Sequence, residues 1–536
     1  MSASSKKKLR NAEQAAKMTE KQLAEQQEAK KLKLYSTLAV VVLVALVIFA
    51  AYVGITRAIE NSGIRERNTV ALTIGEHELS NAELNYYYID SVNNFYNNYG
   101  GYASLLGLDL TKPLDEQVIN EEDGTTWADD FLTGAIEAAK ATYAVVDEAT
   151  ANGYTLPEEA TAYVDNTMST MQMYASLYGY PNTDSYLKAM YGKGATEETL
   201  RNYFEMNYLA SYYQEHYQNS LTYTDEQLRE REAENYNNYS SFSYNYYYLN
   251  ANSFVEGESS DEHTEEELAA AVTAAEAAAK ALTDGISTVD AFNKAIAELG
   301  VNAGNAGTVS TVAEDVRLTN INSAYADWVA DDARKAGDMT YVANSTTDAE
   351  GNETINGYYV VLFNGRNDNT FALRNVRHIL VAFEGGTTDS TTGQTTYTVD
   401  EKASAHDKAE ELLSQWKAGE ATEVSFAELA NAESDDGDGT TGGLYTDIYP
   451  GQVVTAFEDW CYADHEVGDT GIVETEYGYH VMYFSGNSET TYRDFMIENE
   501  LVSNDYNAWY TALIEAVNVT EGSFKYISKD LVLSAS

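Results

Sequence analysis

The feature that constrains this chain most is a single uncharged apolar run from Leu34 to Thr56. A helix of these 23 residues would reach roughly 34 Å at about 1.5 Å per residue. The hydrocarbon core of a bilayer is about 30 Å thick, so a helix of this length can cross it. We therefore predict that 34–56 forms a transmembrane helix.

The residues before the run are strongly basic, which sets its orientation. The first 33 residues carry nine Lys or Arg against four Glu, and the positive-inside rule keeps such a segment cytoplasmic. We predict a cytoplasmic tail over 1–33, a retained anchor over 34–56, and a single-pass protein whose bulk lies outside the cytoplasm. A cleaved signal peptide is the alternative. It is less favoured because the run is long for such a peptide and no clear small-x-small cleavage site precedes Arg57.

Acidic residues outnumber basic ones in the rest of the chain. The whole sequence has 85 Asp and Glu against 33 Lys and Arg, and its net charge is −52. Setting aside the nine bases and four acids of the tail leaves a net charge of −57. This charge repels phosphate backbones, which argues against nucleic acid as a partner, and it favours solubility. The single Cys461 allows no internal disulfide, so stability must come from packing.

A helical, chaperone-like domain is predicted over 69–239. Thr69 to Ile74 has the pattern of a short strand, and Ser80 with Glu83 forms a capping box that begins a helix. Further segments carry apolar residues at three- and four-residue spacing, typical of helices packed on one face. These segments are 127–151, 157–178, 183–190 and 196–220.

Stripes of Met and Tyr in this region leave two interpretations open. Met168, Met171, Met173 and Tyr174 lie close together in one predicted helix. They are either ordinary core residues or part of an adaptable apolar surface that holds unfolded chains.

Beyond Ser241 the pattern changes, and one order of elements occurs twice. Each copy has a strand, a helix, a shorter helix and a closing strand. In the first copy, over 240–366, these are 242–249, 264–282, 289–299 and 357–363. In the second copy, over 375–487, they are 376–383, 400–416, 426–432 and 478–484. The repetition predicts two modules of the α+β class, each an antiparallel sheet with flanking helices.

The second copy also carries a series of short motifs. In order, they are Arg377-His-Ile-Leu-Val381, Phe426-Ala-Glu-Leu-Ala430, Ser434-Asp-Asp436, Gly442-Gly-Leu444, Gly451-Gln452, Phe457-Glu458, Gly468-Asp469 and Tyr477-Gly-Tyr-His-Val481. This succession resembles the parvulin family of peptidyl-prolyl isomerases. Together with the anchor and a helical region like the SurA N-terminal domain, the plan is similar to exported foldases of the PrsA and SurA type, although the likeness outside the module is looser.

The resemblance implies the residues of an isomerase site that works without cofactor or metal. The residues that match the catalytic positions are His378, Asp436, Thr475 and His480. Those that match the walls of the proline pocket are Leu444, Val453, Phe457 and Tyr477. Val453 stands where Met is commoner, which puts substrate preference and rate in question, and Tyr477 stands where bacterial members more often carry Phe.

The chemistry explains why such a pocket is needed. Rotation about an X-Pro bond meets a barrier of about 18–20 kcal/mol and takes tens to hundreds of seconds unaided. A small pocket that excludes water, grips the proline ring and favours the twisted amide can lower this barrier without a covalent step.

Each candidate also has a plainer interpretation. A lone His in a strand is usually half-buried with a satisfied hydrogen bond. Asp436 belongs to an acidic, Gly-containing run that suits a solvated turn, and the run lacks the spacing of a calcium loop. Cys461 and His465 lie four residues apart, but they have no further ligands beside them, so we expect them at the surface rather than on a metal.

The first copy lacks the histidine pair. Tyr246 and Tyr359 stand where the second copy has His378 and His480. We predict that this module is inactive, and the resemblance implies that it still offers a groove for peptide binding.

A C-terminal helix and tail are predicted over 491–536, with the helix at 492–517. The whole sequence predicts a membrane-tethered foldase outside the cytoplasm, acting on unfolded exported proteins, with a homodimer as one possible assembly. A non-enzymatic holdase that uses both modules for binding is the main alternative. A structural surface protein, suggested by the many Tyr and Asn residues, is a third interpretation, which leaves the ordered motifs unexplained.

Overall fold

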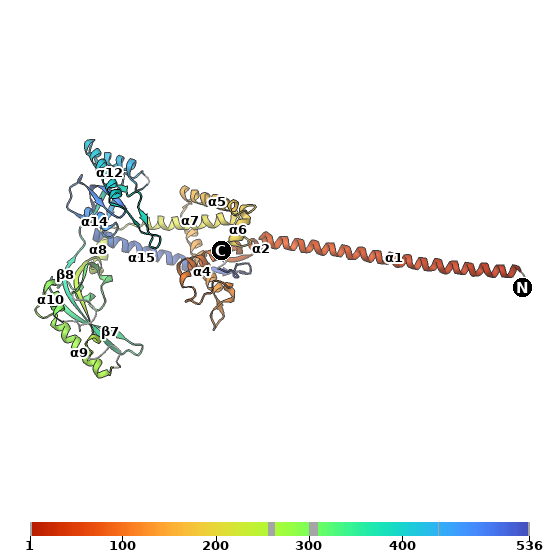
Figure 1. Cartoon of the computed structure of the whole chain (residues 1–536), viewed down its shortest axis with the longest axis horizontal. Helices are drawn as coiled ribbons and strands as arrows, with labels where there is room; N and C mark the ends of the chain where they lie inside the picture. Colours follow the sequence, from red (N-terminus) through yellow and green to blue (C-terminus); the bar gives the residue numbers. More distant parts are fainter. Residues whose placement is uncertain (1–2, 256–262, 300–308, 438, 534–536) are drawn as a thin grey trace. The chain divides into compact units, whose positions relative to one another are not determined.

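The structure is a computed structural model that describes residues 3–255, 263–299, 309–437 and 439–533 (Figure 1). The side chains of 12, 14–32 and 34–41 lie outside this description. The chain divides into two compact units, Met1–Leu221 with Asn504–Ser536 and Thr222–Ser503, and each is described by itself.

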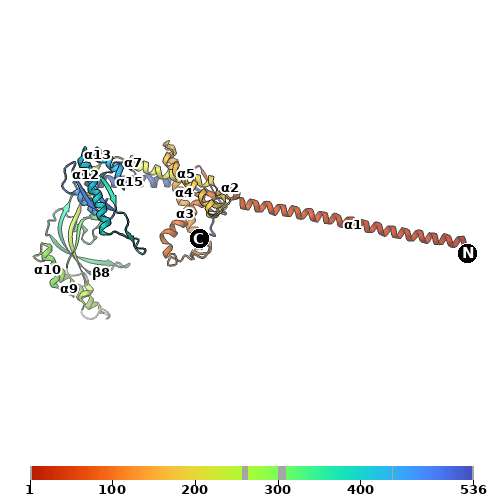
Figure 2. The ribbon, with the colours of Figure 1, turned by 45° about the horizontal axis from the view of Figure 1, so that its top comes forward.

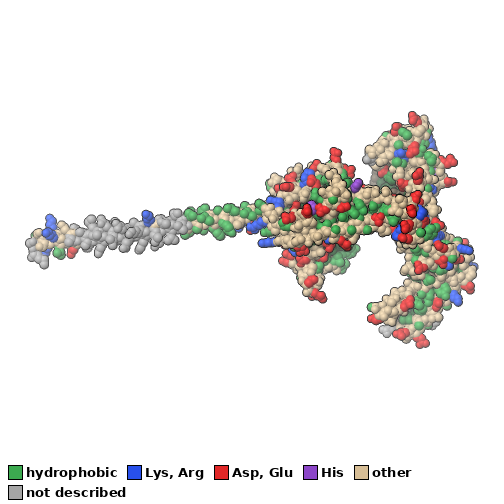
Figure 3. All heavy atoms as spheres, turned by 180° about the vertical axis from the view of Figure 1, so that it is seen from behind, with side chains coloured by type: hydrophobic (Ala, Val, Ile, Leu, Met, Phe, Trp, Pro, Cys, Tyr) green, Lys and Arg blue, Asp and Glu red, His purple; other side chains and the backbone are tan. Residues whose placement is uncertain are grey.

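The predicted apolar helix is part of a longer one, α1 (Ala3–Ser62). Within the described side chains, Val42–Ser62 is long and apolar enough to cross a membrane, and its residues are not buried by the rest of the protein. Figure 3 shows the apolar stretch in green along the helix. Gly63, whose φ of 72° lies in the left-handed region, ends α1 and begins α2 (Ile64–Asn68).

A small antiparallel sheet lies in the first unit, in the order β15-β1-β2. It consists of β1 (Val70–Ile74), β2 (His77–Ser80) and β15 (Val519–Glu521). The strand predicted at 69–74 is therefore present, and its partner β15 comes from near the end of the chain. This pairing explains why the last residues belong to the first unit.

The helices of the first unit follow the predicted segments closely. They are α3 (Asn81–Tyr99), α4 (Trp127–Ala151), α5 (Glu158–Leu177), α6 (Thr183–Tyr191) and α7 (Glu197–Ser220), and a short hairpin of β3 (Val118–Asn120) and β4 (Thr125–Thr126) precedes α4. The capping box at Ser80 and Glu83 is formed as predicted. Such caps satisfy the free N–H groups at the start of a helix, so nearby residues alone indicate where the helix begins.

The Tyr and Met stripes of this unit divide between core and surface. Tyr87, Tyr88 and Met168 are buried, whereas Met173 is 56% exposed. Other large apolar side chains of the same region are also exposed, namely Tyr163, Leu177, Tyr178 and Met190. The core interpretation is therefore confirmed for the buried residues, and the interpretation as a surface for unfolded chains stays a prediction for the exposed ones.

The second unit contains two four-stranded antiparallel sheets with the same strand order, β6-β5-β8-β7 and β12-β9-β14-β13. The first sheet consists of β5 (Ser241–Asn250), β6 (Thr311–Arg317), β7 (Met339–Thr347) and β8 (Glu353–Asn367). The second consists of β9 (Ala372–Ala382), β12 (Leu444–Ile448), β13 (Thr470–Glu474) and β14 (Gly478–Thr491). The strands predicted from the sequence are the central pair of each sheet.

Helices cover corresponding faces of the two sheets. In the first, α9 (Glu265–Ala281) and α10 (Val289–Leu299) pack on one face (Figure 2). The short helix α11 (Ala326–Ala330) packs on the other face. In the second, α12 (Val399–Ala418) and α13 (Glu423–Glu433) cover one face and α14 (Thr455–Tyr462) the other. A hairpin of β10 (Thr387–Thr388) and β11 (Thr395–Thr396) precedes α12, α8 (Asp225–Glu234) precedes β5, and α15 (Tyr492–Ala516) follows β14.

Candidate active site

Two adjacent strands bring the predicted histidines together. β9 and β14 pair antiparallel with His378 opposite Met482 and His480 opposite Leu380, so the two histidines are diagonal neighbours. Alternate residues of a strand face opposite sides of the sheet. Ile379 belongs to the core under α12, and both histidines therefore face α14.

A glycine pair allows a loop to approach β9 closely. Gly442 and Gly443 have φ values of 66° and 63°, a conformation that favours glycine. The N–H of His378 donates to the carbonyl of Gly443 at 2.9 Å, and a Cβ on Gly443 would lie 2.1 Å from the carbonyl oxygen of His378. Only glycine fits there. This contact places Tyr445, near the start of β12, beside His378, whereas Leu444 pairs with Arg377, the residue before His378.

A continuous chain of hydrogen bonds runs through the two imidazoles. Asp436 Oδ2 lies 3.0 Å from His378 Nε2, and His378 Nδ1 lies 3.1 Å from His480 Nδ1. His480 Nε2 lies 2.9 Å from Thr475 Oγ1, which also accepts the backbone N–H of Tyr477 at 3.2 Å. The predicted catalytic residues thus lie within one connected network.

When both imidazole rings are neutral, every hydrogen bond in this network pairs one donor with one acceptor. The carboxylate of Asp436 accepts, so His378 Nε2 carries the hydrogen and His378 Nδ1 is an acceptor. His480 then donates from Nδ1 and accepts the hydroxyl hydrogen of Thr475 at Nε2. The network therefore assigns one tautomer to each ring.

Burial favours these neutral forms. His378 is 3% and His480 is 6% exposed. Desolvation lowers the pKa of His378, and the nearby charge of Asp436 acts against this shift. Desolvation, together with the neighbouring His378, lowers the pKa of His480 to about 4. Both imidazoles are therefore neutral at pH 7.

Aromatic side chains surround the pair on the α14 face. Phe457 meets both imidazoles edge to face, with each pair of ring centroids 5.3 Å apart. Tyr445 lies 4.9 Å from the His378 ring and 6.2 Å from Phe457, and Val453 packs against the buried cluster that contains Phe457. The result is a polar pair bordered by an apolar wall, a surface suited to a proline ring.

Two predicted wall residues lie farther out. Leu444 is 36% exposed at the start of β12, and Tyr477 is 59% exposed in the turn between β13 and β14. The backbone of Tyr477 reaches the network through Thr475, whereas its side chain faces solvent.

A family model of the PPIC-type PPIase domain matches residues 358–487, which include β9, β14 as far as Asn487 and all members of the hydrogen-bond network. The chain carries a parvulin-type peptidyl-prolyl isomerase domain. The match ends at 487, as the predicted second module does, and it begins earlier than that module, within β8.

Solved structures similar to the chain include PrsA proteins of three Bacillus species. The peptidylprolyl isomerase PrsA of Bacillus anthracis shares 20% identity, and the match covers 28% of this chain and 59% of that one with a TM-score of 0.18. PrsA of Bacillus subtilis shares 22% identity, and the match covers 27% of this chain and 48% of that one with a TM-score of 0.17. PrsA of Bacillus cereus shares 17% identity, and the match covers 60% of this chain and 85% of that one with a TM-score of 0.17. The chain thus spans less than two thirds of the Bacillus anthracis structure. No curated protein matches it significantly.

Tyr445 contacts two of the predicted catalytic residues although the sequence analysis did not single it out. Its hydroxyl donates to Asp436 Oδ2 at 3.0 Å, and its ring meets His378 at 71°. Burial and the hydrogen bond to the carboxylate raise the pKa of Tyr445. The one feature of the sequence that points to Tyr445 is its position directly after the Gly-Gly-Leu motif.

The expected surface position is wrong for Cys461. Its side chain is fully buried in the cluster that contains Phe457 and Met482, and burial raises the pKa of the thiol to about 12. Phe457 and Cys461 lie four residues apart on α14, so both face the sheet. His465 is half-buried, and its Nε2 bonds to the carbonyl of Trp460 at 2.9 Å.

One group of possible metal ligands occurs in the described part of the chain. His406, Asp407 and Glu410 lie on α12, with ligand atoms within 4.8 Å of one another. This group is on the sheet face away from the isomerase site. In the site itself, the facing nitrogens of His378 and His480 already bond to each other, which leaves neither free for a metal.

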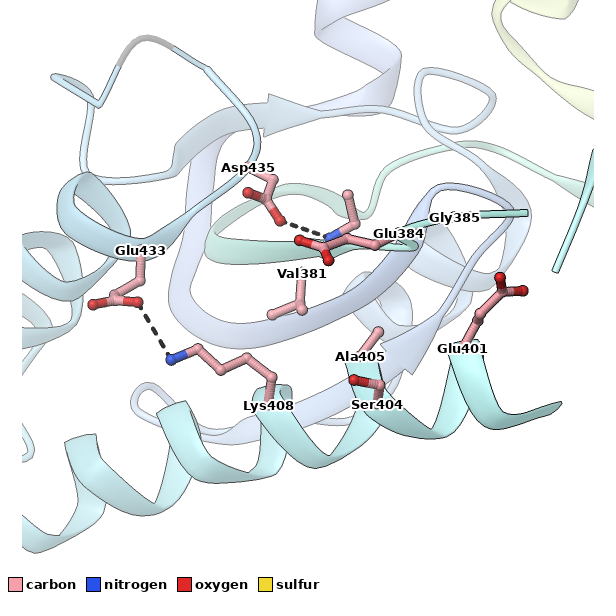
Figure 4. A pocket seen from close by; sticks show the side chains of 10 residues that line it. Val381, Glu384, Gly385, Glu401, Ser404, Ala405, Lys408, Glu433 and Asp435 are labelled. Atoms are coloured by element: carbon pink, nitrogen blue, oxygen red, sulfur yellow. Dashed lines mark hydrogen bonds and ion pairs between the residues drawn. The ribbon is translucent and has the colours of Figure 1, made fainter. Parts of the chain in front are cut away.

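A polar cavity of about 690 Å³ lies on the face of the second sheet that α12 covers, between α12 and the end of β9 (Figure 4). Val381, whose side chain belongs to the core under α12, lines it together with several carboxylates. Lys408 pairs there with Glu433 at 3.5 Å, and Asp435 accepts the N–H of Ala382 at 2.9 Å. The sheet separates this cavity from the histidines, so it is not the proline pocket.

Proposed function

We propose that this protein is a membrane-anchored foldase that isomerises X-Pro bonds in exported proteins outside the cytoplasm and also holds unfolded chains. The observation that carries the catalytic part is the meeting of His378, His480 and Asp436 beside Phe457 within the isomerase domain.

The site lowers the rotation barrier without a covalent step. The planar X-Pro amide resists rotation by about 18–20 kcal/mol because its C–N bond has partial double-bond character. Phe457 and Val453 hold the proline ring out of water, which weakens solvation of the planar, more polar amide. Interactions that are stronger with the twisted amide than with the planar one then accelerate rotation.

The hydrogen-bond network fixes the polar side of the pocket. Asp436 sets the tautomer of His378, His378 sets that of His480, and the hydroxyl of Thr475 donates to the remaining nitrogen of His480. Asp436 is the most exposed member, at 39%, so its carboxylate is the group that meets the substrate peptide. We assign catalytic roles to these four residues and pocket roles to Val453 and Phe457, and we place the exposed Leu444 and Tyr477 outside the pocket wall.

The membrane anchor determines where the proposed foldase acts. α1 is the candidate membrane span, and the basic residues before it favour a cytoplasmic N-terminus. Tethering keeps the isomerase beside the membrane surface where exported chains emerge, which raises their effective concentration near the site.

The first sheet of the second unit is proposed to be a degenerate parvulin-like module. Its register places Tyr246 opposite Val361 and Tyr359 opposite Tyr248, the pattern that β9 and β14 give to the histidines. Tyr325, followed by Ala-Asp-Trp as Phe457 is followed by Glu-Asp-Trp, lies 5.4 Å from Tyr359. Tyrosine rings replace the imidazole pair, so we assign this module to binding without catalysis.

The alternative is a non-enzymatic holdase that uses both modules for binding alone. It is favoured by the missing histidines of the first module and by the short Val453 in the second. Refolding of a protein limited by prolyl isomerisation distinguishes the two functions, because the uncatalysed step takes tens to hundreds of seconds.

The test uses the full-length protein in detergent and its Asp436→Ala variant. We expect the wild type to shorten the slow refolding phase and to reduce aggregation. The variant should reduce aggregation only, since it keeps the binding surfaces. An unchanged slow phase with the wild type, together with reduced aggregation, would select the holdase.

A further inference from the structure

The helical unit contains a polar cavity that isomerisation does not use. Its volume is about 360 Å³, and it lies among α3, α4 and α7. Tyr87 and Asp90 line it from α3, Ala138 from α4, and Tyr203 and Asn207 from α7. Residues three or four apart on a helix share one face, so Tyr87 and Asp90 on α3 face the cavity together, as do Tyr203 and Asn207 on α7.

Asp90 is the charged group of this cavity. Its Oδ2 accepts a hydrogen bond from the hydroxyl of Tyr203. Among the described residues, no Lys, Arg or His forms an ion pair with it. Desolvation raises the pKa of Asp90, and the hydrogen bond from Tyr203 acts in the opposite direction. A partly buried carboxylate that lacks a cation gains more from an incoming positive charge than a fully solvated one does.

The walls beside Asp90 are aromatic and held in place. The rings of Tyr87 and Tyr203 are 4.8 Å apart at 78°. Asn207 donates to the hydroxyl of Tyr87 at 3.2 Å and to the carbonyl of Tyr203 at 2.7 Å. Tyrosine faces attract cations through their electron density, and a carboxylate adds a charge-assisted hydrogen bond.

We propose that this cavity binds an alkylammonium or guanidinium group, with Asp90 as the counter-ion and Tyr87 and Tyr203 as walls. The end of a Lys or Arg side chain has this chemistry, and so do free organic cations. The net charge of −52 draws either toward the protein. That the cation belongs to an unfolded client rests on the proposed function, whereas the cation preference of the cavity does not.

The test measures peptide binding to the full-length protein in detergent by fluorescence anisotropy. One probe is a labelled octapeptide of Gly and Ser with a single central Arg, and the other carries Gln at that position. We expect the Arg peptide to bind at least about tenfold more tightly, which corresponds to about 1.4 kcal/mol. Competition with free Nα-acetyl-arginine amide identifies the source: displacement only at far higher concentration indicates a peptide side chain, and equal potency indicates a small cation.

Variants assign the preference to the cavity. Asp90→Asn still accepts the hydrogen bond from Tyr203 but lacks the charge, and Ala138→Met fills the space while leaving the charge. Each should reduce binding of the Arg peptide to the level of the Gln peptide. Asp147→Asn, which removes a more exposed carboxylate of the same unit, should leave the preference intact.

Equal binding of the two peptides by the wild type would overturn the proposal, and so would an undiminished preference in both cavity variants. The isomerase assay separates this result from the proposed function. A protein that prefers the Arg peptide but accelerates no prolyl isomerisation would contradict the foldase and not the cavity.

Discussion

Asp436 lies next to Asp435 in a run of Asp and Gly residues that suits either a solvated turn or a catalytic loop. The structure gives the two carboxylates different partners, since Asp435 bonds to the N–H of Ala382 and Asp436 lies against His378. Local sequence does not distinguish adjacent Asp residues, because both are compatible with a turn. The family pattern singled out Asp436, whereas Tyr445, outside that pattern, was found only from its contacts.

The low pKa of His480 predicts a pH-dependent stability of the isomerase domain. An unfolded His takes up a proton near pH 6.5, whereas folded His480 does so only near pH 4. The unfolded state therefore binds more protons between these values, and stability falls as the pH decreases through this window. We expect a loss of roughly 2 kcal/mol between pH 7 and pH 4.5 from this group.

Hydrogen exchange of the β14 amides, corrected for intrinsic rates, measures this loss as an opening free energy. The His480→Gln variant lacks the titrating group and supplies the reference. Between pH 7 and pH 4.5, the opening free energy of the variant should fall by roughly 2 kcal/mol less than that of the wild type. An equal fall in the two proteins would contradict the assigned protonation state of His480.

Tyr445 is expected to hold Asp436 toward His378. In Tyr445→Phe the ring remains but the hydroxyl bond to the carboxylate is lost, so kcat/KM for a prolyl peptide should fall by about tenfold or more, since a hydrogen bond to a charged group contributes about 1.5–3 kcal/mol. Tyr449→Phe is the matched control, because Tyr449 stacks on Phe495 outside the site. Equal activity of both variants would show that the Tyr445 hydroxyl has no role.

At the scale of elements, helices with local caps were predicted more completely than strands. Ser80 and Glu83, or Thr264 and Glu267, satisfy each other within four residues, so the sequence alone indicates where those helices begin. The edge strands β6, β7, β12 and β13 depend on pairing with the central strands, and no local pattern set their bounds. Their positions were therefore found only in the structure.

Gly478 is the point where the pairing of β9 and β14 is most sensitive. A Cβ at this position would lie 2.1 Å from the carbonyl oxygen of Val381, so Gly478→Ala must displace one strand from the other. We expect a destabilisation of the isomerase domain by about 2–4 kcal/mol, measured by hydrogen exchange of the β9 amides. Gly365→Ala, where a Cβ meets open space, is the control. Comparable losses in both variants would contradict this reason for the glycine.

At the scale of the whole molecule, the sequence indicated an N-terminal apolar helix and a repeated order of elements, because both depend on composition and periodicity. It did not indicate that β15 pairs with β1, since sequence gives no signal for a contact between the two ends of a unit. It also gave Cys461 the wrong position, because the local sequence does not reveal that α14 packs this residue against the sheet.

The proposed membrane topology is tested with protease added to intact cells that express the protein with an N-terminal epitope. We expect the acidic body to be digested and an epitope-bearing fragment that includes α1 to be protected, because the basic tail holds the N-terminus in the cytoplasm. A variant with the nine basic residues of the tail replaced by Gln should lose this uniform orientation. Protection of the whole protein in intact cells would contradict the extracytoplasmic location.

The catalytic claim is tested most directly by the cis-to-trans isomerisation rate of a proline tetrapeptide in the presence of the full-length protein. The account predicts acceleration by the wild type and a loss of at least about tenfold in kcat/KM for His378→Ala and for Asp436→Ala, equivalent to about 1.4 kcal/mol of transition-state stabilisation. His406→Ala, a histidine on the other face of the same sheet, should retain full activity. No acceleration by the wild type, or undiminished rates in both site variants, would contradict the account.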